Sequence, residues 1–465
     1  MHVNTDFLVI GSGPAGSVLS YFLAKQNFNV SIVDVAHNKK NKKQTHQSFI
    51  KKQSKNYTPQ FSGVLGGNSE LWASKVWLMS KDYFDEKKWM MSYDELLNNS
   101  EELSEYFGIE HNSLINVECK NKVKQRSACR PNFNNLFEYL NIENNTNIEV
   151  YEGFSPNGLS KKNGKIVSVT AVDLTGNEVS FDINQSLIFC AGGINNPRLL
   201  LNLIKDCNDN VGKYLVDHPH INLGDLGFDQ LHLNSEIAKP YLLKHKNPFA
   251  CEGNAMIDID GIEAGIQLDG RVDVGRLFKK SYLKSKNPFI INFIKMIEFF
   301  FRKNVLLFYK ITRLTGMKSG YFSYEFFFSQ TSGSNKVELS KEKDAYGLYK
   351  SNIFWRVSKK DEEIYNKIIR RVIPKNVVFK ENSVLTGYHP SSTTIIGKDK
   401  ETSVVDSDLR LHGISNIYVC GSSVFPTCGA VNPTWTIMTL AYRLSKHLSL
   451  SKKNEFETYK KLVYF

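Results

Sequence analysis

Apolar residues near the start of the chain follow two different spacings. Phe7–Ile10 is an uninterrupted apolar run that ends in glycine, which is typical of a strand buried on both faces of a parallel sheet. From Pro14 to Leu23, apolar residues recur at intervals of three and four, which predicts a helix with one buried face. Val30–Val33 then predicts a second strand. The N-terminal pattern is therefore strand, helix, strand.

Later segments continue this mixture of helix and strand. Tyr93–Tyr106 predicts a helix and Asn147–Tyr151 a strand. The stretch Gly164–Asn184 alternates apolar and polar residues around a turn at Thr175–Asn177, as an antiparallel hairpin does. Ser186–Cys190 returns to the pattern of a buried strand. We expect an α/β, Rossmann-like domain assembled from discontinuous segments.

The middle of the chain has a different pattern, and 465 residues are too many for one ordinary core. Several β-type runs are interrupted by an aromatic, basic and helical-looking stretch at 288–314. We therefore predict a cofactor domain made of residues 1–220 and 385–465. Residues 221–384 are predicted to form a second, α+β domain with an antiparallel sheet for the substrate.

The 288–314 stretch is apolar but cannot comfortably span a bilayer. Lys295, Glu298, Arg302 and Lys303 interrupt its run of phenylalanines and isoleucines. Its apolar side chains could pack on the second domain, or they could lie in a membrane interface beside the flanking cations. Both alternatives stay open at this point.

Composition and charge narrow the class of protein only in part. A hydrophobic fraction of 41% with 23% charged residues indicates a soluble globular chain. The net charge of +12 fits a nucleic acid, a membrane surface or a phosphorylated substrate as partner. The densest basic stretch, 39–55, has no signature of a nucleic-acid reader, so we expect a solvated surface loop and no nucleic-acid partner.

Cysteines and the N-terminus bear on the compartment. The seven cysteines are odd in number and form no C-x-x-C pair, which favours a reducing compartment and gives no metal-site motif. The first apolar run has no Lys or Arg before it and breaks at once into glycines, unlike a signal peptide. We expect a cytoplasmic protein, with a peripheral position at the membrane as the alternative.

Glycines at positions 11, 13 and 16 lie between the first strand and the first helix, and Asp34 ends the second strand. This is the dinucleotide-binding fingerprint in its required context. The first glycine permits the turn, the second lets the backbone approach a pyrophosphate, and the third allows close helix packing. Asp34 is expected to accept a hydrogen bond from a ribose hydroxyl. The predicted phosphate-binding segment is Gly11, Ser12, Gly13, Pro14, Ala15 and Gly16.

Further motifs along the chain resemble those of the glucose/methanol/choline (GMC) flavin oxidoreductases. Their second FAD loop is similar to Gly66–Trp72, and their strand-to-helix turn is similar to Ala191–Leu200. The C-terminal part carries the strongest resemblance, with His389–Thr394, Ile417–Thr427 and Asn432–Thr434. The resemblance runs nearly from end to end, and it implies the fold of this family with FAD as the cofactor.

The resemblance also implies a set of site residues. In this family a histidine at the position of His389 lies over the flavin as the proton acceptor, and a His or Asn, here Asn432, faces the same alcohol oxygen. Leu71 holds the place of a histidine that is joined to the flavin in one subgroup, so the FAD is expected to be noncovalent. The implied cofactor contacts, besides the fingerprint and Asp34, are Gly66, Gly67, Asn68, Ser69, Trp72, Val150, Ala191, Gly192, Gly421, Ser422, Asn432, Pro433 and Thr434.

Hydride leaves an alcohol carbon for flavin N5 only as the hydroxyl proton departs, which requires a neutral imidazole such as His389. Asn432 can donate its amide to the developing alkoxide. We therefore expect an FAD-dependent oxidoreductase acting on a CH–OH group of a small alcohol or carbohydrate. The alternatives are sterol or fatty-alcohol oxidation at a membrane surface, a non-redox lyase of the same family, and a membrane-associated flavoprotein scaffold. The electron acceptor (oxygen, a quinone or a protein) is not determined.

Overall fold

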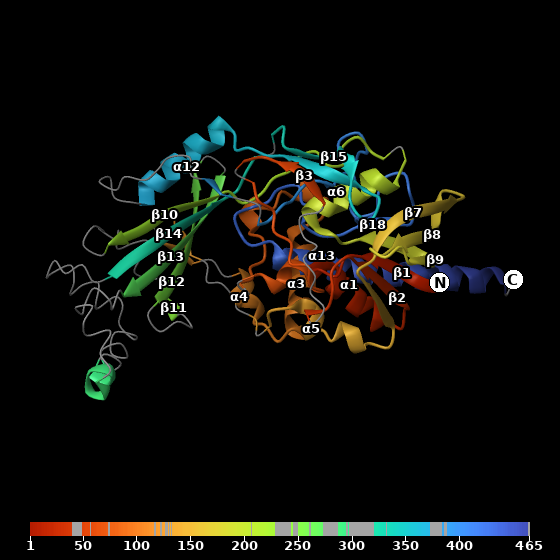
Figure 1. The fold of residues 1–465 in the computed structure, drawn as a ribbon, viewed down its shortest axis with the longest axis horizontal. Helices are drawn as coiled ribbons and strands as arrows, with labels where there is room; N and C mark the ends of the chain where they lie inside the picture. Colours follow the sequence, from red (N-terminus) through yellow and green to blue (C-terminus); the bar gives the residue numbers. More distant parts are fainter. Residues whose placement is uncertain are drawn as a thin grey trace.

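A computed structural model describes most of the chain. The described residues are 1–39, 49–55, 57–72, 75–115, 118–120, 123–125, 129, 131, 133–205, 207–227, 243–244, 250–259, 262–272, 287–293, 296, 320–331, 333–372, 384–385 and 388–463. Figure 1 shows two bodies side by side, one built on a sheet near both chain ends and the other on a second sheet beneath α12.

The first sheet has the order β6-β2-β1-β9-β8-β7, and β18 pairs with β9. Strands β6, β2, β1, β9 and β18 are parallel, whereas β7, β8 and β9 form an antiparallel meander. The strands are β1 (His2–Ile10), β2 (Val30–Asp34), β6 (Ile148–Glu152), β7 (Ser155–Lys162), β8 (Lys165–Val172), β9 (Glu178–Phe189) and β18 (Ile417–Val419). The Rossmann-like α/β prediction is confirmed.

Strand β9 is longer than the sequence predicts. The predicted hairpin arm and the predicted strand Ser186–Cys190 form one continuous strand of 12 residues. Its first half pairs with β8 and β1, and its second half lies between β1 and β18. Because the second half is buried on both sides by parallel neighbours, it loses the alternation that marks the first half.

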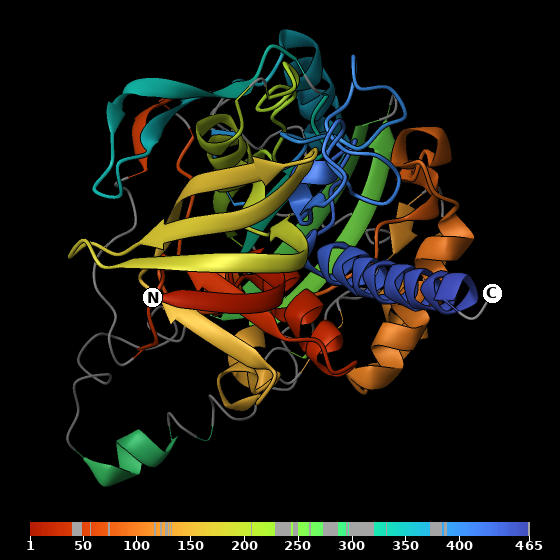
Figure 2. The same ribbon diagram turned by 90° about the vertical axis from the view of Figure 1, so that its right-hand side faces the viewer.

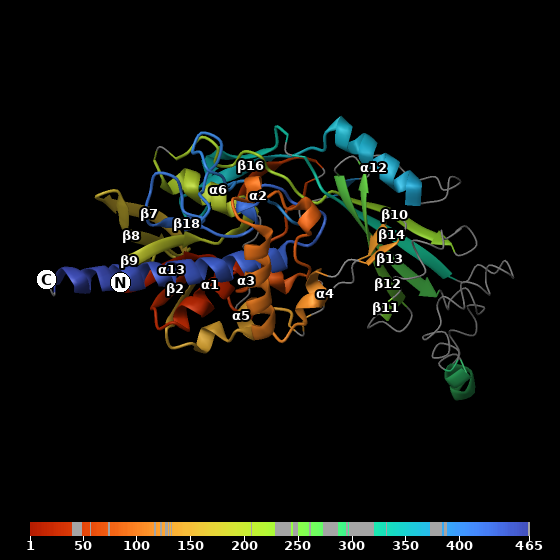
Figure 3. The same ribbon diagram turned by 180° about the vertical axis from the view of Figure 1, so that it is seen from behind.

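Helices cover the first sheet. Helix α13 (Thr434–Val463) packs on α1 (Pro14–Ala24) and α3 (Tyr93–Tyr106), as Figure 3 shows from behind. Helix α3 begins where predicted because Ser92 accepts a hydrogen bond from the backbone of Glu95. The shorter helices here are α2 (Glu86–Trp89), α4 (His111–Ile115), α5 (Leu136–Tyr139) and the 3₁₀ turns η2 (Gly67–Glu70), η3 (Lys81–Tyr83), η4 (Ile142–Asn144) and η5 (Ser422–Val424).

The second sheet has the order β17-β10-β14-β13-β12-β5-β4, with β11 paired to β12. Its pairings are all antiparallel. Its strands are β4 (Glu118–Lys120), β5 (Val123–Gln125), β10 (His220–Gly227), β11 (Leu243–Lys244), β12 (Ala250–Ile259), β13 (Ile262–Val272), β14 (Gly320–Phe328) and β17 (Val384–Leu385), and α12 (Lys359–Val372) covers one face. Strands β4 and β5 join it from the part of the chain that the sequence assigns to the cofactor domain. The predicted domain boundaries stay a prediction.

A third, small sheet contains β15 (Lys336–Lys343), β16 (Tyr349–Phe354) and β3 (Ile50–Gln53). Helix α6 (Gly192–Leu203) packs against it. Arg198 of α6 forms a buried ion pair with Asp344 of the β15–β16 loop. In the basic stretch 39–55, β3 belongs to this sheet and Lys39 forms ion pairs, while 40–48 lies outside the described residues.

Within the 288–314 stretch, the structure describes 288–293 as helix together with residue 296. This short helix stands away from the rest of the molecule in both Figure 1 and Figure 2. Phe289 is 79% exposed, and Phe293 and Met296 are also exposed. None of the described helices is long and apolar enough to cross a membrane.

Candidate active site

A cavity of about 310 Å³ opens at the carboxyl ends of β1 and β2, where open α/β sheets bind their ligands. It is lined by residues from most of the predicted motifs, which are far apart in the sequence. The predicted residues that line it are Gly11, Gly13, Pro14, Ala15, Asp34, Gly67, Asn68, Ser69, Trp72, Ala191, Gly192, His389, Gly421, Ser422, Pro433 and Thr434.

The three fingerprint glycines have different structural surroundings. Gly11 has a φ of +105°, which disfavours any other residue, and a Cβ there would lie 2.7 Å from the carbonyl oxygen of Cys190. A Cβ on Gly16 would lie 1.9 Å from the carbonyl oxygen of Gly11. Gly13 has no heavy atom within 4 Å of its Cβ position, so its surface is open to a ligand.

The first turn of α1 fits the phosphates of a dinucleotide. Gly13 is its N-cap, and no side chain accepts a hydrogen bond from its first N–H groups. These N–H groups and the helix dipole favour an anion. Asp34 lines the cavity nearby, where its carboxylate accepts hydrogen bonds from the backbone and hydroxyl of Ser12 at 2.6 Å each. The chain therefore offers a cradle for a pyrophosphate with an acidic group beside it.

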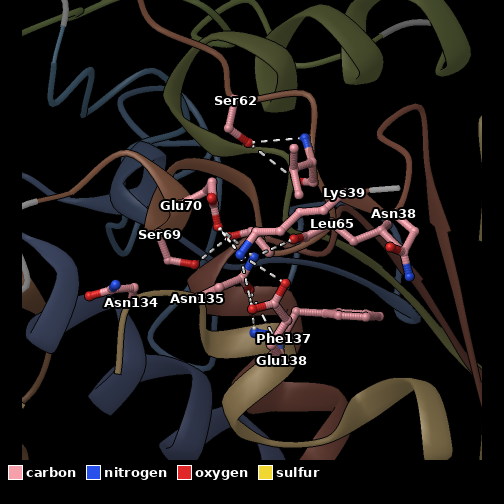
Figure 4. A network of polar contacts seen from close by, with 12 residues as sticks. Asn38, Lys39, Ser62, Leu65, Ser69, Glu70, Asn134, Asn135, Phe137 and Glu138 are labelled. Carbon is pink, nitrogen blue, oxygen red and sulfur yellow. Dashed lines mark hydrogen bonds and ion pairs between the residues drawn. The ribbon is translucent and has the colours of Figure 1, made fainter. Parts of the chain in front are cut away.

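The second predicted FAD loop lies directly on the fingerprint. Gly67 approaches so closely that a Cβ on it would lie 2.9 Å from the Cα of Gly13. A polar network beneath the loop fixes it, as Figure 4 shows. Asn135 donates to the carbonyl oxygen of Leu65 at 2.8 Å and to Glu70 at 3.1 Å. Lys39 joins Glu70 to Glu138 with a 2.9 Å ion pair to each.

His389 reaches the cavity from a loop that is fixed at several points. Its backbone N–H donates to Asp217 at 3.0 Å, and Ser391 exchanges backbone hydrogen bonds with Val216. The hydroxyl of Ser422 donates to the carbonyl oxygen of Pro390 at 2.7 Å. The loop thus joins the segment before β10 to the turn after β18, and it holds the imidazole at the cavity wall.

The surroundings of His389 keep its imidazole uncharged. Burial lowers its pKa well below the ordinary value of 6.5, and the nearby His218 and His220 lower this pKa further. The ring of His218 lies edge-on at 4.9 Å between ring centroids. A neutral imidazole in contact with a cavity is the form that can accept a proton.

The pKa shifts of Asp217 and His218 have opposite effects on how the stability of the fold changes with pH. Burial raises the pKa of Asp217 to about 6 and lowers the pKa of His218 to about 4. Folded Asp217 retains a proton that the unfolded chain releases above pH 3.8, so its contribution to stability grows as pH falls from 6 to 4. Folded His218 stays unprotonated where the unfolded chain binds a proton, below pH 6.5. Its contribution to stability is therefore lost as pH falls from 6.5 to 4.

We expect Asp217→Asn to make the protein more sensitive to acid. The amide oxygen still accepts the two backbone N–H groups of His218 and His389, but the compensating carboxyl is gone. Between pH 6.5 and 4, the free energy of unfolding should fall by roughly 3 kcal/mol more than in the wild type, as measured by urea denaturation. Asp209→Asn, at an exposed aspartate, is the control. Identical pH slopes for wild type and Asp217→Asn would contradict the assignment.

Some predicted site residues do not line the cavity. Ser12, Gly16 and Gly66 support the two loops, and Val150 lies in β6. Asn432, the predicted partner of His389, is half-buried and directs its amide toward the carbonyl oxygen of Lys75 at 3.4 Å. The roles of His389 and Asn432 therefore stay predictions.

The sequence analysis did not single out Asp217 and His220, which lie beside His389, or Glu325, which forms a hydrogen bond with His220. Asp217 and His220 stand in the run Asp217-His218-Pro219-His220, whose density of titratable groups was a usable signal. Glu325 lies 105 residues beyond His220, and no local pattern marks it. Among the described residues, no group of three or more His, Cys, Asp or Glu is arranged to hold a metal ion.

Parts of the chain are similar to known proteins. Residues 331–441 match the GMC oxidoreductase C-terminal family, and residues 9–38 match the NAD(P)-binding Rossmann-like domain. Pyridoxine 4-oxidase of Microbacterium luteolum is 44% identical over 66 residues, which are 13% of each protein. C-glycoside 3-oxidase of Arthrobacter globiformis is 28% identical over 115 residues, or 23% of this chain and 22% of that enzyme. These and other curated relatives are matched over 9% to 62% of their own lengths.

Formate oxidase of Aspergillus oryzae shares the fold, with a TM-score of 0.65 over 97% of this chain and 99% of that chain at 16% identity. The fold and the cavity are those of a dinucleotide-binding protein. In its C-terminal part and in several short stretches the chain is similar to GMC oxidoreductases. The predicted resemblance to this family and the prediction of FAD as cofactor are confirmed.

Proposed function

We propose that this protein oxidises the CH–OH group of a small alcohol or carbohydrate, with noncovalently bound FAD as the electron acceptor in the site. The observation that carries the proposal is the neutral imidazole of His389 in the same cavity as the fingerprint and the uncapped N-terminus of α1. A base and a dinucleotide cradle are the two parts that such an oxidation requires. The relatives named for pyridoxine and C-glycoside oxidation support the substrate class.

The residues of the chain have separable tasks in this reaction. FAD, when bound, supplies the two-electron chemistry by accepting the hydride of the alcohol carbon at flavin N5. His389 accepts the hydroxyl proton, and its depressed pKa keeps it ready to do so at neutral pH. The uncapped N–H groups of α1 and the open face of Gly13 hold the pyrophosphate. We assign to Asn432 a hydrogen bond to the alcohol oxygen, which requires its amide to turn away from Lys75.

Anaerobic reduction of the bound flavin tests this function. The FAD-loaded protein is mixed in turn with sugars, glycosides, pyridoxine, sterols and fatty alcohols while the absorbance of oxidised flavin is followed. Bleaching by one class establishes the oxidation and identifies the substrate class. A flavin that stays oxidised with every donor contradicts the proposal and favours the non-redox lyase. A protein that binds no FAD contradicts the cofactor assignment.

The exposed helix at 288–293 favours a second candidate, oxidation of a sterol or fatty alcohol at a membrane surface. Phe289, Phe293 and Met296 expose large apolar surfaces, and Ile291 is also exposed. In the sequence, Lys295, Arg302 and Lys303 follow closely. Apolar side chains beside cations are the combination that binds an anionic lipid surface. The same surface would serve a membrane-associated flavoprotein that lacks the oxidation.

We expect the protein to sediment with vesicles that contain an anionic lipid, and the double variant Phe289→Ser/Phe293→Ser to bind them at least roughly tenfold more weakly. Leu174→Ser removes an apolar residue about as exposed as Phe293 from the β8–β9 turn and is the control, which should bind normally. Failure of the wild-type protein to sediment with anionic vesicles would contradict the membrane candidate. Normal binding by the double variant excludes this helix as the contact.

A further inference from the structure

The second sheet has one face against α12 and another toward the cavity side. Phe328 of β14 is fully buried and stacks on Tyr365 of α12 at 4.1 Å between ring centroids. Because side chains alternate along a strand, Phe327 and Glu325 lie on the opposite face. His220 of β10 pairs with Phe327 in the antiparallel register and packs against its ring at 4.3 Å. The face away from α12 therefore carries a histidine and a glutamate as neighbours.

His220 and Glu325 form a hydrogen-bonded carboxylate–imidazole pair. Nδ1 of His220 donates to Oε1 of Glu325 at 3.2 Å. The side chain of His220 is 11% exposed, and that of Glu325 is 34% exposed. A carboxylate on one ring nitrogen holds the proton there, which leaves the other nitrogen as an acceptor. In this pair the free acceptor is Nε2 of His220, and the carboxylate reaches solvent.

The pair lies beside the predicted base. The ring centroids of His220 and His389 are 6.5 Å apart, and Tyr388 lies 4.9 Å from His220. Nε2 of His220 and Nδ1 of His389 are both buried and have no hydrogen-bond partner among the described residues. Buried polar atoms in proteins nearly always have a partner. Two imidazoles at this spacing can share one bridging water, which would satisfy both nitrogens.

Of the two carboxylates near His220, only Glu325 reaches solvent among the described residues. The other carboxyl group, Asp217, is fully buried, and His218 is also buried. Among the described side chains, the groups that face His220 are Asp217, His218, Glu325, Tyr388 and His389. Glu325 is therefore the carboxylate through which a proton can leave.

We propose that His220 and Glu325 carry the proton from His389 to solvent after each oxidation. The inference rests on the function proposed above. The alcohol O–H bond breaks, and its proton binds one ring nitrogen of His389. The Nδ1 proton of His389 passes through the bridging water to Nε2 of His220. The Nδ1 proton of His220 passes to Oε1 of Glu325, from which water removes it. Both imidazoles are then neutral but carry their proton on Nε2, so each must return to its Nδ1 tautomer by proton exchange with water before the next oxidation.

The first test measures histidine tautomers in FAD-loaded protein labelled with ¹⁵N-histidine, and it needs no donor. Nuclear magnetic resonance should show neutral His220 with its proton on Nδ1, with signals assigned by His220→Gln. In Glu325→Gln, the share of this tautomer should fall, because a neutral amide holds the Nδ1 proton less strongly than a carboxylate does. Glu338→Gln changes a glutamate of similar exposure in the third sheet and should leave this share unchanged. A proton on Nε2 in the wild type, or an unchanged share in Glu325→Gln, overturns the proposal.

The second test separates proton release from the oxidation itself, with whichever alcohol bleaches the flavin. In Glu325→Gln, a single anaerobic flavin reduction should keep its rate within about twofold, because His389 can still accept one proton. Repeated turnover should slow roughly tenfold and recover when imidazole is added as a mobile proton carrier. Unchanged turnover, or slow turnover that imidazole does not restore, overturns the relay. If no alcohol bleaches the wild-type flavin, the proposed function fails, while the tautomer measurement still decides whether the pair is poised as described.

Discussion

His389→Ala is expected to reduce the rate of anaerobic flavin reduction by roughly a hundredfold or more, while FAD stays bound. The imidazole is the neutral base at the cavity wall, and its removal leaves the hydroxyl proton without an acceptor. The backbone hydrogen bond to Asp217 is retained, so the loop should keep its path. Stopped-flow absorbance of the flavin measures the rate, and the spectrum of the denatured protein measures the FAD content.

The pH dependence provides an independent check on the same residue. Because the pKa of His389 is lowered well below 6.5, the wild-type reduction rate should stay constant down through pH 6.5 and decline only in more acidic solution. His2→Ala changes an exposed histidine and should have no effect. Near-normal reduction by His389→Ala would refute its assignment as the base.

Gly13→Val is expected to remove FAD binding without destabilising the fold. The Cβ position of Gly13 has no heavy atom within 4 Å and its φ of −61° suits any residue, so the protein itself accommodates the side chain. The valine would occupy the space through which the pyrophosphate approaches α1. We expect the affinity for FAD to fall by at least roughly a hundredfold, or about 2.7 kcal/mol. Fluorescence titration of the FAD-free protein with FAD measures the affinity.

Two further glycine variants show whether this effect is specific. Gly333→Val places the same side chain in open space on an exposed loop and should leave FAD affinity unchanged. Gly16→Val should instead destabilise the protein itself, since its Cβ would overlap the carbonyl oxygen of Gly11 at 1.9 Å. Tight FAD binding by Gly13→Val would show that the dinucleotide does not lie on this turn.

The elements that the sequence predicts well are those with a local cause. The turn at Gly11 depends on neighbouring positions, and α3 has both its cap at Ser92 and its periodicity within one segment. The second sheet is harder because its order depends on long-range pairing. Nothing in Glu118–Gln125 indicates that it pairs with β12, some 130 residues later. Of the predicted helical stretch 288–314, residues 288–293 and 296 are helical, and the others lie outside the described residues.

The site shows the same division between local and distant causes. His389 was predicted because a motif surrounds it, and the structure places it in the cavity. Within this motif, Ser392 has a φ of +69°, in the left-handed region that favours glycine. The His220–Glu325 pair depends on the register of β10 and β14, which no sequence pattern fixes.

The pairing of β18 with β9 has a consequence for how the chain is synthesised. Strand β9 ends at Phe189, but its parallel neighbour spans Ile417–Val419, and the cavity wall also needs Pro433 and Thr434. A ribosome must therefore translate beyond Val419 before the first sheet is complete. Until then, the edge of β9 that pairs with β18 offers unpaired backbone groups to other chains, which is a known route to aggregation. Efficient production should consequently depend on chaperones that protect the growing chain, and the complete FAD cavity can form only after Thr434 has been added.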